Sequence, residues 1–103
     1  MEFTPWIIGR VIEELRTDVE NLKDSVKDFK RKKTIRNLCT VYGHFFQVER
    51  THSFLDIIFW DPKWKGLISN ETWDKKIAAL DSEVKEAMKP VYNLTYEIMD
   101  CEV

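Results

Sequence analysis

A glutamate and a histidine three residues apart are the strongest hint of chemistry in this sequence. Glu49 and His52 have the Glu-x-x-His spacing that places two metal ligands on one helical face in carboxylate-bridged di-iron bundles. Such a site needs a second pair of this kind and two further inward glutamates. The other histidine, His44, has no glutamate three residues before it. We therefore expect no metal site, a hydrogen-bonded and partly buried His52, and a solvent-facing Glu49.

A catalytic thiol is the next possibility. Cys39 could pair with either histidine, but no signature of a thiol hydrolase surrounds it. The two cysteines, Cys39 and Cys101, form no CxxC pair, so both are expected to be reduced and buried, and the bundle topology described below predicts that they are neighbours. Gly-rich phosphate loops and the GxSxG and HExxH motifs are absent from the sequence. We assign no catalytic residue and no cofactor, and expect that the protein is not an enzyme.

One basic cluster stands out in an uneven charge pattern, in which residues 69–103 are acidic. It places five cations within seven residues: Lys30, Arg31, Lys32, Lys33 and Arg36. Such a cluster could bind the phosphates of a nucleic acid, with an affinity that falls as salt rises. The net charge of −2 excludes a strongly cationic nucleic-acid protein. Cations at the end of a helix are also favoured by the helix dipole and are commonly just solvent-exposed residues of a turn. The acidic residues Asp100 and Glu102 are expected to lie near the cluster and to neutralise it.

A tryptophan loop, residues 60–66, is the most unusual stretch of the sequence. It holds four candidate partner-binding residues: Trp60, Lys63, Trp64 and Lys65. Tryptophan is typical of the energetic centre of protein interfaces. The rings could equally fold back as an apolar plug over the end of the helices, covering Phe59 and Leu67. The sequence leaves both alternatives open.

Heptad spacing of apolar residues predicts two long helices that would position these residues. The first, over 5–32, has Thr4 as its N-cap, Pro5 in its first turn and a seam of Ile8, Ile12, Leu15, Val19, Leu22, Val26 and Phe29. The last, over 70–99, begins after a capping Ser69 or Asn70. Its seam is Trp73, Ile77, Leu80, Val84, Ala87, Val91, Leu94 and Ile98.

The middle of the chain is harder to assign. Residues 40–48 are rich in β-branched and aromatic residues, so an α+β fold with a hairpin in residues 40–60 is the alternative. We favour a helix over 34–59, with a core face of Ile35, Leu38, Tyr42, Phe45, His52, Leu55 and Phe59 that is interrupted by Glu49. The helix should end before Asp61 and Pro62, because a residue that precedes proline avoids helical geometry.

Three helices of roughly 40 Å each predict an all-α fold, with three long antiparallel helices in an up-down-up bundle. A chain of 103 residues is expected to form a single helical-bundle domain, 1–103. Apolar runs stay far below the roughly 18 residues of a membrane span, and no secretory signal opens the chain. We expect no membrane partner and a cytoplasmic protein.

The preferred function is a non-enzymatic protein–protein interaction module, such as an adaptor, an assembly factor or an inhibitor. The long seams resemble those of coiled coils and could also pair two copies as a homodimer. The alternative is a nucleic-acid-binding protein that uses the basic cluster at residues 30–36.

Overall fold

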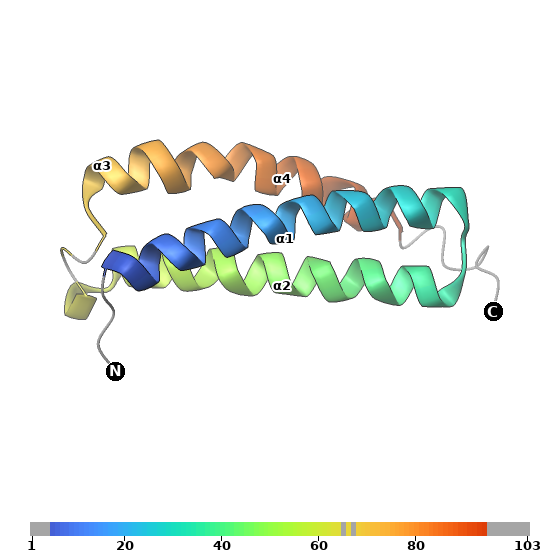
Figure 1. Ribbon diagram of the computed structural model, residues 1–103, viewed down its shortest axis with the longest axis horizontal. Coiled ribbons are helices and arrows are strands. Elements are labelled where there is room, and N and C mark those ends of the chain that lie inside the picture. Colours follow the sequence, from blue (N-terminus) through green and yellow to red (C-terminus); the bar gives the residue numbers. More distant parts are fainter. Residues whose placement is uncertain (1–4, 65, 67, 95–103) are drawn as a thin grey trace.

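The fold is all-α, as the sequence predicts. The computed structural model describes residues 5–64, 66 and 68–94, and within these ranges it contains no strand. The elements are the helices α1 (Pro5–Arg31), α2 (Ile35–Trp60), α3 (Asn70–Thr72) and α4 (Ala78–Asn93), the 3₁₀ helix η1 (Pro62–Trp64) and the π-helix η2 (Trp73–Ile77). Figure 1 shows α1 and α2 joined by a short turn at one end, with the chain passing from the far end of α2 through α3 back to α4.

The turn between α1 and α2 is built by side-chain caps. Thr34 is the N-cap of α2, and its hydroxyl accepts a hydrogen bond from the Asn37 N–H at 3.1 Å. The Asn37 side chain donates to the Lys32 carbonyl at 2.8 Å, and the same carbonyl accepts from the Thr34 N–H at 3.0 Å. The predicted cap Thr4 lies outside the described residues.

Both predicted seams lie in the core of a single chain. All seven predicted seam residues of α1 are buried. In the last seam, six residues are buried, Trp73 is half-buried and packs against the core, and Ile98 lies outside the described residues. Because these seams are already covered by the chain's own helices, a homodimer would have to use another surface.

The predicted helix over 34–59 is confirmed, since α2 covers nearly the same residues, and the alternative of a hairpin in residues 40–60 is wrong. The predicted core face of α2 is only partly right. The buried residues are Leu38, Val41, Phe45, Val48, Thr51, Leu55 and Ile58. Ile35 is exposed, and Tyr42, His52 and Phe59 are half-buried. The helix is thus rotated, so that Val48 rather than Glu49 faces the core.

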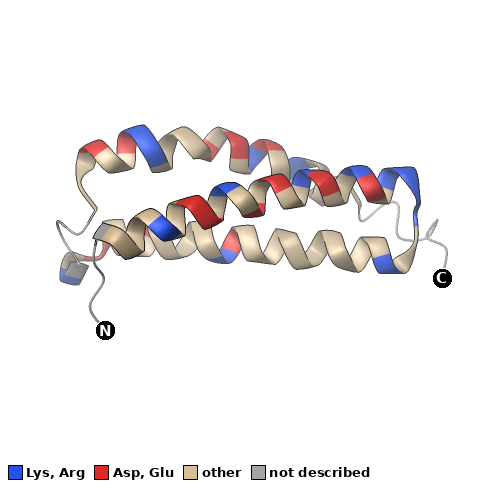
Figure 2. Cartoon of the chain, viewed as in Figure 1, with Lys and Arg blue, Asp and Glu red and all other residues tan. Residues whose placement is uncertain are grey.

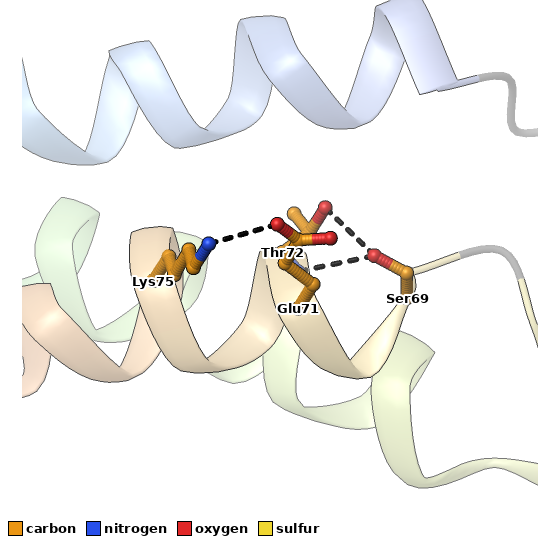
Figure 3. A network of polar contacts seen from close by, with 4 residues as sticks. All are labelled: Ser69, Glu71, Thr72 and Lys75. Atoms are coloured by element: carbon orange, nitrogen blue, oxygen red, sulfur yellow. Dashed lines mark hydrogen bonds and ion pairs between the residues drawn. The ribbon is translucent and has the colours of Figure 1, made fainter.

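The last helix is less regular than its seam predicts. Ser69 caps α3, and its hydroxyl accepts from the Thr72 N–H at 3.0 Å. The same hydroxyl donates to the Thr72 hydroxyl at 2.9 Å, and Lys75 pairs with Glu71 one turn on (Figure 3). A π-helical turn then follows, in which the Ala78 N–H reaches back five residues to the Trp73 carbonyl. Among the described residues, no helix combines the length and the apolar character that a bilayer crossing requires.

Candidate interaction surfaces

The outer face of α2 stands out because it has so little charge. In α1, 12 of 27 residues are Asp, Glu, Lys or Arg, whereas α2 has four in 26 residues: Arg36, Glu49, Arg50 and Asp56. Figure 2 shows the contrast between the alternating charges of α1 and the mostly uncharged α2. A surface helix normally carries its polar residues on the side away from the core, whereas α2 also exposes four large apolar side chains: Ile35, Phe46, Ile57 and Trp60.

Several large apolar side chains outside the core are aligned along α2, in two groups separated by polar residues, and we call this row the α2 stripe. It consists of Ile35, Tyr42, Phe46, Ile57 and Trp60. Successive helical residues are about 100° apart, so these five side chains lie within roughly 30° of one line along the helix. Phe46, Ile57 and Trp60 are 58%, 61% and 68% exposed. Single exposed apolar residues are ordinary on a protein surface, whereas an aligned set of them is a candidate interaction surface.

Aromatic rings from two helices widen the stripe in the first half of α2. Phe46 packs edge-on against Phe45 with ring centroids 5.6 Å apart, and Phe45 packs edge-on against Tyr92 of α4 at 5.7 Å. The ring centroids of Tyr42 and Phe46 are 6.3 Å apart. Phe45 belongs to the core, while Phe46 and Tyr92 are mostly exposed. The core therefore extends to the surface here as an aromatic patch.

A second aromatic group lies at the other end of α2. Phe59 stacks on Trp73 at 4.2 Å with an interplanar angle of 9°, and Trp60 packs edge-on against both rings. The Trp60 indole N–H donates to Asp56 at 3.1 Å, which holds the ring at the surface. Trp73 is thus a cover over Phe59 that the sequence analysis did not identify, although it had placed Trp73 at the head of the last seam.

The remaining residues of the tryptophan loop are less well defined as a site. Lys63 is exposed in η1, and its N–H donates to the Asp61 carboxylate at 2.9 Å. The backbone of Trp64 ends η1, while Lys65 and Leu67 lie outside the described residues. Of the four predicted partner-binding residues, Trp60 is therefore the one whose exposed ring the structure places on a larger surface.

No known protein family, characterised protein or solved structure matches this chain. The surfaces themselves must therefore carry any functional argument.

The basic cluster lies where α1 passes into α2, at one end of the molecule (Figure 2). Lys30, Arg31, Lys32 and Arg36 are exposed, and Arg31 pairs with Asp28 at 3.0 Å. Lys33 is half-buried. A cation that the sequence analysis missed joins them, since Lys89 of α4 lines the same surface hollow as Lys30. The acidic residues Asp100 and Glu102, expected to neutralise the cluster, lie outside the described residues.

Glu49 and His52 lie in different surroundings. His52 Nε2 lies 3.2 Å from Asp81 Oδ1 on α4, while Glu49 is exposed, so both residues behave as predicted. Lys85 lies 3.0 Å from the other oxygen of Asp81, and its hydrogen bond holds the pKa of Asp81 below the usual range. Within the described residues, no group of three or more His, Cys, Asp or Glu side chains is arranged to hold a metal ion.

A second polar contact joins α1 to α2. The Thr51 hydroxyl donates to Asp18 at 3.3 Å. Burial raises the pKa of Asp18, while the Thr51 hydrogen bond and nearby His44 act in the opposite direction. Asp18 and Asp81 thus fasten α2 to its two neighbours, and we assign neither a role in binding.

The prediction that Cys39 is buried is wrong. Cys39 is a free, exposed thiol on α2. Its position follows from the rotation of α2, because it is four residues after Ile35 and three before Tyr42, on the same side as the stripe. The expected neighbour Cys101 lies outside the described residues.

Proposed function

We propose that this protein is a non-enzymatic protein–protein interaction module and that the α2 stripe is its docking surface. A single observation carries the proposal: α2 exposes an aligned row of large apolar side chains although its core face is already fully packed. Keeping such side chains in water is unfavourable, and a partner that covers them removes apolar surface from water. Adaptors, assembly factors and inhibitors all work through such a surface.

The composition of the stripe supports docking of protein rather than of a small ligand. Tryptophan and tyrosine dominate the energetic centres of protein interfaces, and Trp60, Tyr42 and the adjacent Tyr92 provide three such rings. The stripe follows a helix of 26 residues, about 39 Å long, which suits an extended partner element such as another helix.

The test compares the wild-type chain with a Phe46→Ser/Ile57→Ser variant as immobilised bait in an extract of the native host. The wash contains about 0.5 M salt, because apolar contacts resist salt whereas ionic contacts are screened. We expect the wild type to retain partner proteins under these conditions and the variant to lose them. Trp6→Ala is the matched control, since Trp6 is an equally large exposed ring on α1, against Arg10. Equal capture by wild type and the stripe variant would refute the proposal.

Nucleic-acid binding is the second candidate, and one observation favours it. Lys89 lies beside Lys30 on a hollow shared by α1 and α4, which enlarges the predicted cluster of Lys30, Arg31, Lys32, Lys33 and Arg36. Cations on separate helices can contact successive phosphates of one strand.

This candidate has its own salt signature. Affinity for a fluorescent RNA or DNA oligonucleotide should fall steeply between 50 and 200 mM salt and be lost in Lys30→Glu/Lys89→Glu. Phe46→Ser/Ile57→Ser should leave this affinity unchanged. An affinity that salt does not alter would eliminate the candidate.

A further inference from the structure

A small hollow lies between the last turns of α1 and α4, at the end of the molecule that carries the basic cluster (Figure 2). Lys30 of α1 lines it from one side, and Lys89, Pro90, Asn93 and Leu94 line it from α4. Its volume is about 260 Å³, below the range of roughly 300–1,000 Å³ that is typical of sites for whole small molecules. The hollow therefore suits one chemical group of a larger ligand.

The polar groups of the hollow lack partners. Lys30, Lys89 and Asn93 are exposed, and their side chains have no hydrogen bond or ion pair within the described ranges 5–64, 66 and 68–94. Lys30 has no carboxylate three or four residues away on α1. Glu86 lies three residues before Lys89, but the two side chains form no ion pair. Two ammonium groups and one amide thus line the hollow without an anion to balance them.

The surroundings of the hollow are positive even after the helix dipoles are counted. The helices α1 and α4 both end here, each with a partial charge of about −0.5, and α2 begins here with about +0.5. These partial charges sum to about −0.5, and Asp28 adds a negative charge beside Arg31. They are outweighed by six cations: Lys30, Arg31, Lys32, Lys33, Arg36 and Lys89. An anion is therefore attracted to this end of the molecule.

We propose that the hollow binds the terminal phosphate of a nucleic-acid strand. At pH 7 a phosphate monoester carries a charge of roughly −1.5 to −2 and three free oxygens, whereas a phosphate inside a strand carries about −1 and two. The two lysines supply two positive charges, and together with the Asn93 amide they offer a donor to each of the three oxygens. This inference rests on nucleic-acid binding, the second candidate function, and specifies which phosphate the site recognises.

The position of the hollow suits the end of a strand. The cations of the basic cluster continue from Lys30 in one direction, through the turn, to Arg36 at the start of α2. On α4 the remaining cation, Lys85, is paired with Asp81 at 3.0 Å. A strand whose terminal phosphate lies in the hollow can therefore place its following phosphates along the turn, one after another.

Oligonucleotides that differ only at their ends test this inference. A short single strand with an internal fluorescent label is prepared with a 5′ phosphate, with a 3′ phosphate and with neither, and its affinity for the full chain is measured at about 0.1 M salt. We expect at least one phosphorylated form to bind roughly tenfold more tightly than the form without a terminal phosphate, which is the effect of one charge-assisted hydrogen bond.

Variants of the hollow separate this preference from general attraction by charge. Lys30→Ala, Lys89→Ala and Asn93→Ala should each remove most of the preference. Asn93→Ala leaves the net charge unchanged, so its effect cannot come from bulk electrostatics. The matched control is Lys27→Ala, which removes an exposed lysine one turn before Lys30 and outside the hollow. It should weaken all three forms alike and keep the preference. Circular dichroism checks that the four variants retain their helix content.

The outcomes distinguish the inference from the function on which it rests. Equal affinity for the three forms, or a preference that survives in all three hollow variants, would overturn the inference and leave nucleic-acid binding through the cluster in place. If inorganic phosphate binds as tightly as the phosphorylated strand, the ligand is free phosphate and the inference is wrong. If the wild type binds none of the three strands, nucleic-acid binding itself fails as well.

Discussion

His52 Nε2 lies 3.2 Å from Asp81 Oδ1, and this contact between α2 and α4 is shared with Lys85, which lies 3.0 Å from Asp81 Oδ2. The Asp81 carboxylate therefore contacts a histidine on α2 and a lysine on its own helix, α4. Because Asp81 is titratable, the stability of the packing between α4 and α2 should depend on pH.

Asp81→Asn should destabilise the fold at neutral pH but not in acid. Because the pKa of Asp81 is lowered, chiefly by its hydrogen bond to Lys85, the folded chain binds this proton less tightly than the unfolded chain. The resulting stability is present above about pH 4 and is lost as pH falls through the lowered pKa. Urea unfolding at pH 7 and at about pH 2 measures the difference. Asp24→Asn, an exposed position on α1, is the control, and a gap that persists at pH 2 would contradict the prediction.

Asp18→Asn should have the opposite effect. Burial raises the pKa of Asp18, so the folded chain binds this proton more tightly than the unfolded chain, and the contribution to stability is lost as pH rises through the raised pKa. The amide keeps an oxygen that can accept from Thr51 but carries no charge. We expect the variant to unfold at higher urea than wild type at pH 7, with no difference at about pH 3. Lower stability at pH 7 would show that the carboxylate itself is needed.

Ser69→Ala should cost about 1 kcal/mol of unfolding free energy, because it removes the acceptor for the Thr72 N–H at the start of α3 (Figure 3). Ser69→Asp should recover most of this loss, since aspartate is an equally good N-cap. Ser53→Ala, an exposed serine inside α2, is the control and should change stability by less than about 0.5 kcal/mol. Chemical denaturation measures all three.

Two glycines should respond to alanine in opposite directions. Gly66 has φ of +88°, so Gly66→Ala should destabilise by about 1 kcal/mol or more. Gly43 lies inside α2, and a Cβ there meets no atom within 4 Å, so Gly43→Ala should stabilise by about 0.5–1 kcal/mol. Thermal unfolding of both variants and of the wild type measures the two changes in stability. Destabilisation by Gly43→Ala would indicate that this face of α2 is already covered.

The sequence predicts α1 and α4 well because each has one apolar face and one charged face. With charges on one side, the heptad positions can be assigned in only one way, and from Ile8 to Leu94 the described seam residues of these helices lie in or against the core. The π-helical turn could not be predicted, because its residues fit an α-helical seam equally well.

The same reasoning fails for α2, where large apolar side chains lie both in the core and on the surface. Phe45 is 8% exposed and its neighbour Phe46 is 58% exposed, yet the two residues are chemically identical. With four charged residues in the helix, little in the sequence fixes its rotation, so the predicted core face includes the exposed Ile35 and omits the buried Val41 and Val48. Of the proposed interaction surface, the sequence therefore predicts only Trp60. The proximity of Lys89 to the basic cluster could not be predicted, because it depends on how α4 packs against α1.

The π-helical turn Trp73–Ile77 contains one residue more than an α-helical path would need. Because the wider turn already absorbs the extra residue, deleting Lys76 from it should restore a regular α-helix and leave the orientation of Trp73 relative to α4 nearly unchanged. The Trp73 ring would then stay stacked on Phe59. The aromatic cover at this end of the molecule should therefore tolerate the loss of one residue at a place where a regular helix would not.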